Sequence, residues 1–532
     1  MNSTSTPSAD TQSPKNILLC TLNSTYQHSS FGLRYIMAQM NELRESTEML
    51  EWTIKENPRN IVENIMTYNP QIVGFGVYIW NTEEIYEVCS ILKKIAPHIT
   101  LVLGGPEISY ETETQRLYPL ADYIICGEAD FSFPEFCRQH LKGNKNSDKI
   151  IRSELPNIKN IQLPYDLYTD NDIANRVIYV EASRGCPYKC EYCLSSLDKS
   201  VRSFDLDLFL AEIQKLIDRG AKSFKFVDRT FNLSPTTSTQ ILNFFLKQIH
   251  LGLFLHFEMV PDRLPHEIRD LIKQFPAGSL QFEVGIQTLN PVVAANVSRK
   301  NDLIKVKENF AYLREHTHVH SHADLIVGLP GETLESFADG FDHLAELGPD
   351  EIQVGILKRL KGTPIIRHEH QFQMRYQDFA PFQILSTSTM NYTTLQLMNR
   401  FAKFWDLYAN SGDFPNFMKW FKKQNGSFFW NYMNFVHFLS EKYSETHSIS
   451  LMNLAEKAWE YVIVIEKNLG QTIDSATFVA NDLIKTDYCD GFKKRDIPPF
   501  MKKQALEQKS GSQKSILNER QLHHKRKDES PL

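Results

Sequence analysis

The sequence has no long apolar run. None of its apolar stretches approaches the roughly 20 residues that a membrane-spanning helix needs, and the opening MNSTSTPSADTQSPK is polar where a secretory signal would be apolar. We therefore expect a cytoplasmic protein without a membrane partner. The formal net charge is only -6, from 58 basic and 64 acidic side chains, so the overall field does not favour nucleic acid as a partner. The basic HHKRK near the end is read as a solvated tail.

Cysteine is scarce as well. Eight cysteines in 532 residues are too few for a disulfide scaffold. Three of them, Cys186, Cys190 and Cys193, fall within eight residues, and this clustering indicates a metal site. The other five are expected to be small buried hydrophobes: Cys20, Cys89, Cys126, Cys137 and Cys489.

The chain is too long for one ordinary core, so several domains are expected. Changes in composition and periodicity predict the following division: disordered residues 1–15, a first domain at 16–145, a linker at 146–175, a second domain at 176–366, a helical domain at 367–500 and a disordered tail at 501–532.

The first domain alternates short apolar runs with amphipathic stretches. Strands are expected at 16–22, 48–54, 71–80, 99–105 and 121–127, with helical stretches at 32–43, 59–68 and 83–95. This alternation predicts an α/β fold with a doubly wound, Rossmann-like parallel sheet. In such sheets ligands bind beyond the carboxyl ends of the strands.

A second alternating series follows the linker. Strands are expected at 177–185, 223–232, 253–260, 279–288, 322–330 and 351–360, with helices between them. Six such units predict a partial (β/α)6 TIM-like barrel with its chemistry at the carboxyl ends of the strands. After about residue 367 the pattern becomes helical and aromatic, which favours a packed α-helical domain over a surface for a large flat substrate.

The three clustered cysteines lie in RGCPYKCEYC, directly after the first strand of the second series. Thiolates are the usual ligands of iron-sulfur clusters. Because no fourth cysteine is near, a 4Fe-4S cluster here would keep one iron open to another ligand. Zinc is the alternative, but it usually takes four protein ligands in a closed site, and unrelated cysteines would rarely share one turn.

This CxxxCxxC loop resembles that of the radical S-adenosylmethionine (radical SAM) superfamily, in which it follows the first strand of a partial barrel. The resemblance implies that the open iron binds S-adenosylmethionine, which is cleaved to methionine and a 5'-deoxyadenosyl radical. It makes Cys186, Cys190 and Cys193 the catalytic cluster ligands. Later segments match the family's strand motifs in order: DRTFN, EVGIQTLN, ADLIVGLPGE and KRLKGTP. The S-adenosylmethionine contacts it implies are Tyr192, Asp228, Glu283, Gln287, Asp324, Gly328 and Lys358.

The first domain resembles the cobalamin-binding domain of one branch of that superfamily. Its turns LGGPEISYE and CGEAD match those that hold cobalamin. The contacts implied are Ser24, Tyr26, His28, Ser29, Tyr78, Trp80, Gly104, Gly105, Pro106, Glu107, Gly127 and Glu128. The sequence departs from the Asp-x-His-x-x-Gly turn that supplies a cobalt histidine in many cobalamin proteins: near His28, Tyr26 takes the aspartate position and Gly32 comes one residue late.

Together these resemblances imply a cobalamin-dependent radical SAM enzyme that methylates or cyclises an unidentified small molecule. Its layout is similar to the anaerobic Mg-protoporphyrin monomethyl ester cyclase group, and the family implies an electron donor such as flavodoxin or ferredoxin. Two alternatives are weighed. A methylthiotransferase would need a second cluster on three first-domain cysteines, but after Cys20 the next cysteine is Cys89. A non-catalytic cobalamin or redox sensor would not need the S-adenosylmethionine motifs.

The cluster assignment predicts the outcome of two cysteine substitutions. Cys190→Ala should reduce the iron bound after anaerobic reconstitution from about four atoms per chain to background and abolish reductive cleavage of S-adenosylmethionine. Cys489→Ala should leave both unchanged, because that cysteine is outside the loop. Full iron content in Cys190→Ala, measured by a colorimetric iron assay, would contradict the assignment.

Overall fold

A computed structural model describes residues 15–443, 449–491 and 495–501. Residues 1–14 and 502–532, which hold nearly all of the two predicted disordered ends, lie outside the described residues. The chain forms two compact units. Unit 1 runs to Arg229 and also contains Arg359–Pro364 and Gln377–Phe382; unit 2 contains Thr230–Lys358, Ile365–Tyr376 and the chain from Gln383 onward.

Unit 1 begins with a six-stranded parallel sheet. Its strands are β1 (Ile17–Asn23), β2 (Thr47–Thr53), β3 (Ile72–Gly76), β4 (Thr100–Gly104), β5 (Tyr123–Cys126) and β6 (Ile150–Arg152), in the order β2-β1-β3-β4-β5-β6. The first five strands confirm the sequence prediction. The sixth lies in the predicted linker and has only three residues, too few to show a periodic pattern.

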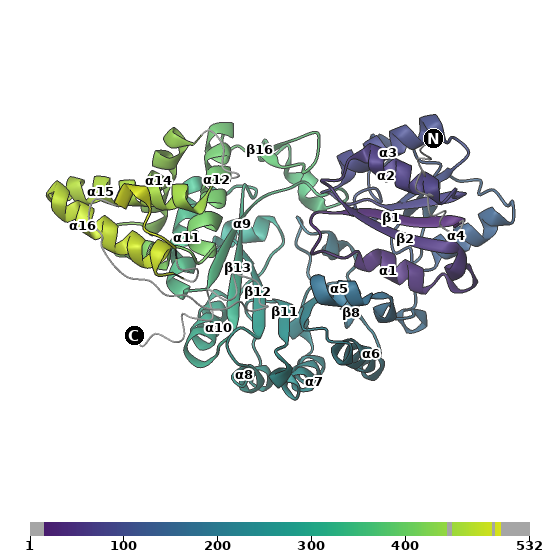
Figure 1. Ribbon diagram of the computed structural model, residues 1–532, viewed down its shortest axis with the longest axis horizontal. Coiled ribbons are helices and arrows are strands. Elements are labelled where there is room, and N and C mark those ends of the chain that lie inside the picture. The colour runs from purple at the N-terminus through teal and green to yellow at the C-terminus, as the bar shows by residue number, and fades with distance from the viewer. Residues whose placement is uncertain (1–14, 444–448, 492–494, 502–532) are drawn as a thin grey trace, which may run out of the picture. The chain divides into compact units, whose positions relative to one another are not determined.

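Helices cover both faces of this sheet (Figure 1). Apolar residues of α2 (Pro58–Thr67) and α3 (Thr82–Ile95) form one core with the sheet. Those of α1 (Phe31–Ala38) and α4 (Ser132–Leu141) form the other. The doubly wound arrangement is therefore confirmed. The helix expected at 32–43 is shorter: α1 ends at Ala38, and a 3-10 helix, Asn41–Ser46, follows from a residue with a φ of 45°.

The segment 146–175 is ordered within unit 1. It contains 3-10 turns at Ile158–Asn160 and Tyr165–Leu167 and helix α5 (Asp170–Asn175). Thr169 caps the N-terminus of α5 in a capping box. Arg34 of α1 is 1% exposed and bonds Glu51 Oε1 at 2.6 Å and Asp172 Oδ2 at 3.0 Å. This buried ion pair joins α5 to the first sheet.

The rest of unit 1 carries the cysteine loop. Strand β7 (Ile178–Val180) pairs in parallel with β10 (Ser223–Phe226), and α6 (Leu206–Asp218) lies between them in sequence. The loop itself lies between two short antiparallel strands, β8 (Ser183–Arg184) and β9 (Arg202–Ser203). β8 lies at the end of the strand expected at 177–185, whereas β9 and its pairing with β8, which close the loop at its base, were not predicted.

Unit 2 continues the strand–helix alternation. Its parallel strands are β11 (Phe254–Met259), β12 (Leu280–Gln287), β13 (His320–Val327) and β14 (Glu351–Ile356), paired in sequence order. The accompanying helices are α7 (Pro235–Leu246), α8 (His266–Ile272), α9 (Pro291–Asn296), α10 (Leu303–His316) and α11 (Leu334–Leu347). With β7 and β10 of unit 1, all six strands predicted for the second series are present.

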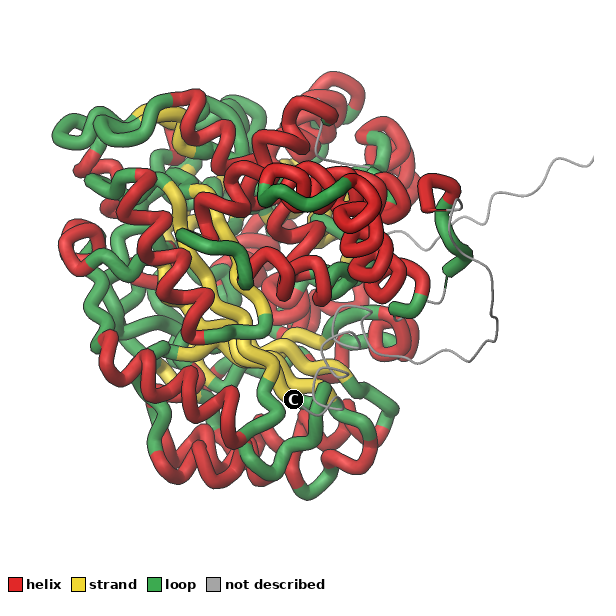
Figure 2. The backbone as a smooth tube through the Cα atoms, turned by 90° about the vertical axis from the view of Figure 1, so that its left-hand side faces the viewer, coloured by secondary structure: helices red, strands yellow, loops and turns green. Residues whose placement is uncertain are grey.

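The end of unit 2 is helical, as predicted (Figures 1 and 2). Its helices are α12 (Tyr392–Trp405), α13 (Pro415–Lys422), α14 (Phe428–Lys442), α15 (Leu451–Asn468) and α16 (Ile473–Ile484). A short hairpin, β15 (Arg375–Tyr376) and β16 (Ile384–Ser386), precedes them. Many of the aromatic side chains pack against one another. The ring centroids of Phe401 and Tyr432, for example, are 5.3 Å apart, and Phe401 is fully buried. They form a hydrophobic core.

Within the described ranges, no helix is both long and apolar enough to cross a membrane.

The buried ion pair of Arg34 predicts a large effect on stability. Arg34→Met leaves the carboxylates of Glu51 and Asp172 buried without their main partner, so we expect a loss of about 3–5 kcal/mol in the free energy of unfolding. Arg44→Met is the matched control, because its pair with Asp166 is exposed and should cost less than about 1 kcal/mol. Urea unfolding followed by circular dichroism measures both, and equal effects would contradict the role given to Arg34.

Candidate functional site

The cysteine loop has a fixed base. Cys186 and Cys190 are 9% and 7% exposed, and Cys193 is half-buried. Burial raises the pKa of the Cys186 thiol, and the nearby Cys193 and Cys190 raise it further. In the described part of the chain no three His, Cys, Asp or Glu side chains converge on one metal ion. Three thiols carried by one loop are the donor type that binds an iron–sulfur cluster, so the chemistry of the donor set fits a cluster.

Asp228 comes two residues after β10 and is 5% exposed. It accepts hydrogen bonds from the Ala182 backbone N–H at 3.0 Å and from Ser183 Oγ at 2.6 Å, both between β7 and the cysteine loop. Burial raises its pKa to about 7. Tyr192, the other S-adenosylmethionine contact expected in unit 1, is half-buried within the loop.

The remaining expected S-adenosylmethionine contacts belong to unit 2. Glu283 on β12 bonds His256 Nε2 at 2.8 Å, and Asp324 on β13 lies 3.5 Å from His322. Gln287 ends β12 with a φ of 71°, and Gly328 follows β13 with a φ of 89°. Lys358, two residues after β14, is exposed. Glu283 and Asp324 thus lie on strands, and Gln287, Gly328 and Lys358 at or beyond strand ends.

Glu332 follows the glycine turn after β13 and is 1% exposed. Its Oε1 accepts a hydrogen bond from Thr288 Oγ1 at 2.7 Å, and its Oε2 is buried without a hydrogen-bond partner in the described structure. Burial raises the pKa of this carboxyl to about 7. Glu332 is therefore readily protonated in the folded protein.

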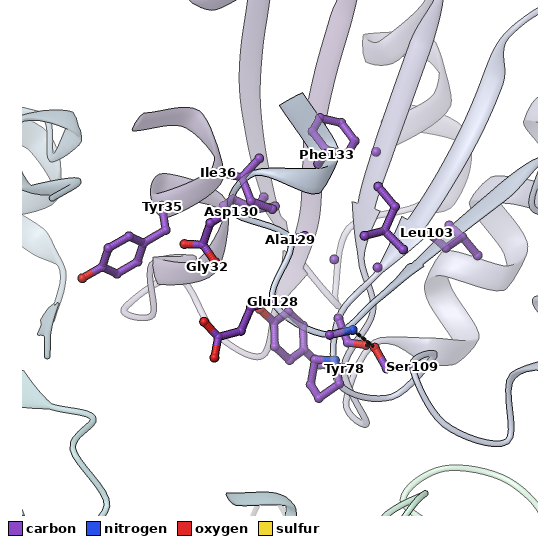
Figure 3. A pocket seen from close by; sticks show the side chains of 18 of the residues that line it. Gly32, Tyr35, Ile36, Tyr78, Leu103, Ser109, Glu128, Ala129, Asp130 and Phe133 are labelled. Carbon is purple, nitrogen blue, oxygen red and sulfur yellow. Dashed lines mark hydrogen bonds between the residues drawn. The ribbon is translucent and has the colours of Figure 1, made fainter. Parts of the chain in front are cut away.

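A cavity of about 450 Å³ lies within unit 1. It is lined by residues at the carboxyl ends of β3, β4 and β5, by α1 and by the segment around the cysteine loop. Six of its lining residues are glycines: Gly32, Gly74, Gly76, Gly104, Gly105 and Gly127. A Cβ atom at Gly74 would come within 2.7 Å of the Phe133 ring, another lining residue (Figure 3). The missing side chains create the space, whose size is typical of a ligand site.

Of these glycines, Gly105 is the one whose position most clearly requires glycine. Its φ is 104°, and a Cβ there would lie 2.6 Å from the Val77 carbonyl oxygen. Any other residue would be strained in conformation and would clash with the end of β3. The turn after β4 is therefore built for close approach of backbone.

Half of the expected cobalamin contacts line this cavity: Tyr78, Gly104, Gly105, Pro106, Gly127 and Glu128. The Gly127 N–H donates to Ser109 Oγ at 3.2 Å, which ties the turns after β4 and β5 together (Figure 3). Trp80 does not line the cavity but stacks on Tyr78 with ring centroids 4.5 Å apart.

The expected contacts in the turn after β1 lie elsewhere. Ser24, Tyr26, His28 and Ser29 do not line the cavity. His28 Nδ1 and the Tyr179 hydroxyl are 2.6 Å apart, and Ser29 Oγ donates to the Val177 carbonyl. Tyr26 is 49% exposed and Ser24 is half-buried. In this structure the turn packs against the segment that leads into β7.

Glu107 is held by a distant segment of unit 1. It is 3% exposed and bonds Lys361 Nζ at 2.8 Å. Arg359 binds both oxygens of Glu111 at 3.0 and 2.9 Å in the same way. Residues 359–364 therefore hold the turn after β4 from outside the cavity.

Apart from Glu128, the sequence did not single out the charged part of the cavity wall. Arg184 Nη1 donates to Glu128 at 2.8 Å and to Asp130 at 3.0 Å, and its Nε donates to Glu181 at 2.8 Å. These four residues line the cavity together with Tyr35, Ser109 and Asp198. Asp130 stands within the CGEAD turn and Arg184 directly before the cysteine loop, so only proximity to known motifs could have indicated them.

Three family models match successive parts of the chain. A B12 binding domain matches residues 17–136, the radical SAM superfamily matches 180–344, and a family described as a protein of unknown function (DUF4080) matches 370–529. The first two give the cofactors: cobalamin, a 4Fe-4S cluster and S-adenosylmethionine.

Among curated proteins, an uncharacterized methyltransferase of Pyrococcus horikoshii is 26% identical over 62% of this chain and 76% of its own length. TokK of Streptomyces tokunonensis, a cobalamin-dependent radical SAM methyltransferase, is 23% identical over 54% of this chain and 47% of its own. The chain thus spans about three quarters of the first and about half of the second. A tRNA-2-methylthio-N(6)-dimethylallyladenosine synthase of Acinetobacter baylyi is 22% identical over 51% of this chain and 59% of its own length. The ribosomal protein uS12 methylthiotransferase RimO of Citrifermentans bemidjiense is 26% identical over 54% of this chain and 66% of its own length.

The fold is similar to that of TsrM, a radical S-adenosylmethionine methyltransferase of Kitasatospora setae solved with cobalamin and a [4Fe-4S] cluster. The TM-score is 0.57 at 15% identity, over 69% of this chain and 82% of that one. The likeness supports the predicted fold class. The layout resemblance to the Mg-protoporphyrin cyclase group is only loose beside these methyltransferases.

The buried carboxyl of Glu332 predicts a pH-dependent stability. Its folded pKa of about 7 exceeds the unfolded value, so the folded state holds the proton more tightly. The stabilisation is complete below about pH 4 and is lost as the pH rises to about 7, by about 3 kcal/mol in total. In Glu332→Gln this pH-dependent loss of stability should disappear. Thermal unfolding of wild type, Glu332→Gln and the exposed control Glu335→Gln from pH 5 to 8 measures it; parallel curves for all three would contradict the shift.

Proposed function

Since a radical SAM superfamily model and a B12 binding domain model match successive parts of the chain, we propose that it is a cobalamin-dependent radical SAM methyltransferase acting on a small-molecule substrate. The observation that carries this proposal is the glycine-lined cavity of unit 1, whose wall includes residues on both sides of the cysteine loop. A cofactor in that cavity would share its wall with the segment that binds the cluster.

The residues have separable roles. Cys186, Cys190 and Cys193 hold the cluster, and the cavity residues of the turns after β4 and β5 hold part of cobalamin. Tyr192, Asp228, Glu283, Gln287, Asp324, Gly328 and Lys358 stay the proposed S-adenosylmethionine contacts. When bound, the cluster with S-adenosylmethionine supplies a radical that removes a substrate hydrogen, and cobalamin supplies a methyl group.

We propose that the cobalt receives no histidine from the turn after β1. Among the described residues that line the cavity there is no histidine. His28, the nearest candidate by sequence, is engaged by Tyr179, and burial together with Lys225 lowers its pKa. Ser24, Tyr26 and Ser29 accordingly lie outside the cavity wall.

A methylthiotransferase is less well supported by the other cysteines. Cys20 and Cys89 are fully buried in the hydrophobic core beneath α2 and α3. Burial raises the pKa of Cys89 to about 12 and that of Cys20 well above its usual value. Cluster ligands must be thiolates, so these cysteines are poor candidates for a second cluster.

Radical SAM enzymes generally need a reductant, and we propose a ferredoxin or flavodoxin. Such donors fit a cytoplasmic location, where thiols are kept reduced. A non-catalytic sensor is the remaining alternative, and the activity test below separates it from an enzyme.

The proposal predicts cofactor-dependent cleavage of S-adenosylmethionine. Anaerobically reconstituted and reduced protein should hold about four irons and yield 5'-deoxyadenosine or S-adenosylhomocysteine, detected by liquid chromatography with mass spectrometry. If neither product forms in protein with full iron content, the enzyme proposal fails.

Cobalamin binding is tested separately by absorption titration with hydroxocobalamin. Wild type should bind it, and Gly104→Leu should weaken binding at least tenfold because the new side chain occupies the cavity. Gly355→Leu is the matched control: a Cβ at either glycine meets one carbonyl oxygen at 3.4 Å, and neither has a positive φ, but Gly355 lies on β14. Equal binding by wild type and Gly104→Leu would remove the cavity from the proposal.

A further inference from the structure

Arg184 lies between the cysteine loop and the wall of the cavity. It is two residues before Cys186, and its side chain is 13% exposed. One guanidinium edge meets both oxygens of Asp130 at 3.0 and 3.1 Å, and Nη1 also donates to Glu128. A planar guanidinium held on two carboxylates is fixed in orientation as well as in charge.

Two of the three carboxylates that accept from Arg184, those of Glu128 and Asp130, belong to the B12-binding part of unit 1, and the third, that of Glu181, follows β7. Glu128 and Asp130 project from the turn after β5, and Tyr35 projects from α1 (Figure 3). The guanidinium carbon lies 4.4 Å from the centre of the Tyr35 ring, a cation–π contact. Glu128, Asp130 and Tyr35 all line the cavity. A ligand that moves this wall therefore acts on the arginine.

The chain between Arg184 and the first cysteine is rigid. Gly185 has a φ of 91° and lies so close to the Ser200 backbone that a Cβ would overlap its carbonyl oxygen. The Cys186 N–H donates to the Asp198 carbonyl at 3.0 Å. Arg202, opposite Arg184 in the β8–β9 pair, bonds Asp198 at 2.9 Å and also Glu128. A displacement of Arg184 therefore also displaces Cys186.

We propose that Arg184 is a positioning residue that couples the two cofactor sites of unit 1. Cobalamin in the cavity fixes Glu128 and Asp130, these fix Arg184, and Arg184 holds the cysteine loop in its cluster-binding arrangement. Coupling of binding is reciprocal, so the cluster in turn strengthens cobalamin binding. The inference rests on the proposed function for the identity of the two groups.

The test needs a variant that folds. Arg184→Met would leave Asp130 and Glu181, whose side chains are 6% and 10% exposed, buried without this cation. Arg184→Lys keeps the charge but loses the two-pronged contact with Asp130. Arg138→Lys is the matched control, because Arg138 also pairs with two carboxylates in unit 1, those of Glu42 and Glu135, and does not line the cavity.

The dissociation constant for hydroxocobalamin is measured by absorption titration of the full chain, once free of cluster and once anaerobically reconstituted. In wild type the cluster should lower this constant at least about fivefold. In Arg184→Lys the ratio of the two constants should fall to within about twofold of one, while Arg138→Lys should keep the wild-type ratio. Iron release to a chelator should be slower with cobalamin than without it in wild type and in Arg138→Lys. In Arg184→Lys the two release rates should be nearly equal.

Each other outcome overturns the inference. A ratio near one in wild type means that the sites are not coupled, and an unchanged ratio in Arg184→Lys means that Arg184 does not couple them. A lower unfolding temperature with both constants raised equally is a structural role only. If wild type binds no cobalamin in either state, the cobalamin part of the proposed function fails too. Normal binding and cleavage with an unchanged Arg184→Lys ratio leave the proposed function intact.

Discussion

The ion pairs of Arg184 and Arg202 are the interaction on which the arrangement of unit 1 most depends. Glu128 and Asp130 follow the fifth strand of the first sheet, whereas both arginines flank the cysteine loop. Buried charges are tolerated only when they are paired, so these side chains require the two segments to lie against each other. These ion pairs consequently connect the wall of the cavity to the base of the cysteine loop.

The cavity itself results from backbone geometry at the carboxyl edge of a parallel sheet. Strands of such a sheet end at one edge, and their turns meet there. Glycine at Gly74 and Gly105 lets Phe133 and the end of β3 come close without filling the space. From the outside, Lys361 holds the turn after β4 through buried Glu107. A site of small residues is thereby enclosed by larger, fixed ones.

Unit 2 combines a strand–helix series with an aromatic core. His256 pairs with Glu283 and His320 with Glu351 across neighbouring strands, so polar groups within the sheet are satisfied in pairs. The helices that follow bury aromatic side chains against one another and against α11, where Phe341 contacts Phe401. The part of the chain that matches a family of unknown function thus begins on the same packed body that carries the later barrel strands.

The sequence by itself determined the features that are local in the chain. The spacing of Cys186, Cys190 and Cys193, the apolar runs of the strands and the glycines after β4 and β5 are set by neighbouring residues, because strand periodicity and turn conformation are short-range properties. The sequence therefore predicted the fold class, and half of the cobalamin contacts expected from it line the cavity. Only the tertiary structure decided the rest. Arg184 meets Asp130 across 54 residues and Lys361 meets Glu107 across 254, and His28 is directed to Tyr179 rather than to the cavity. Such contacts depend on how separate elements pack, and no spacing within one segment encodes which distant side chain a charge will meet.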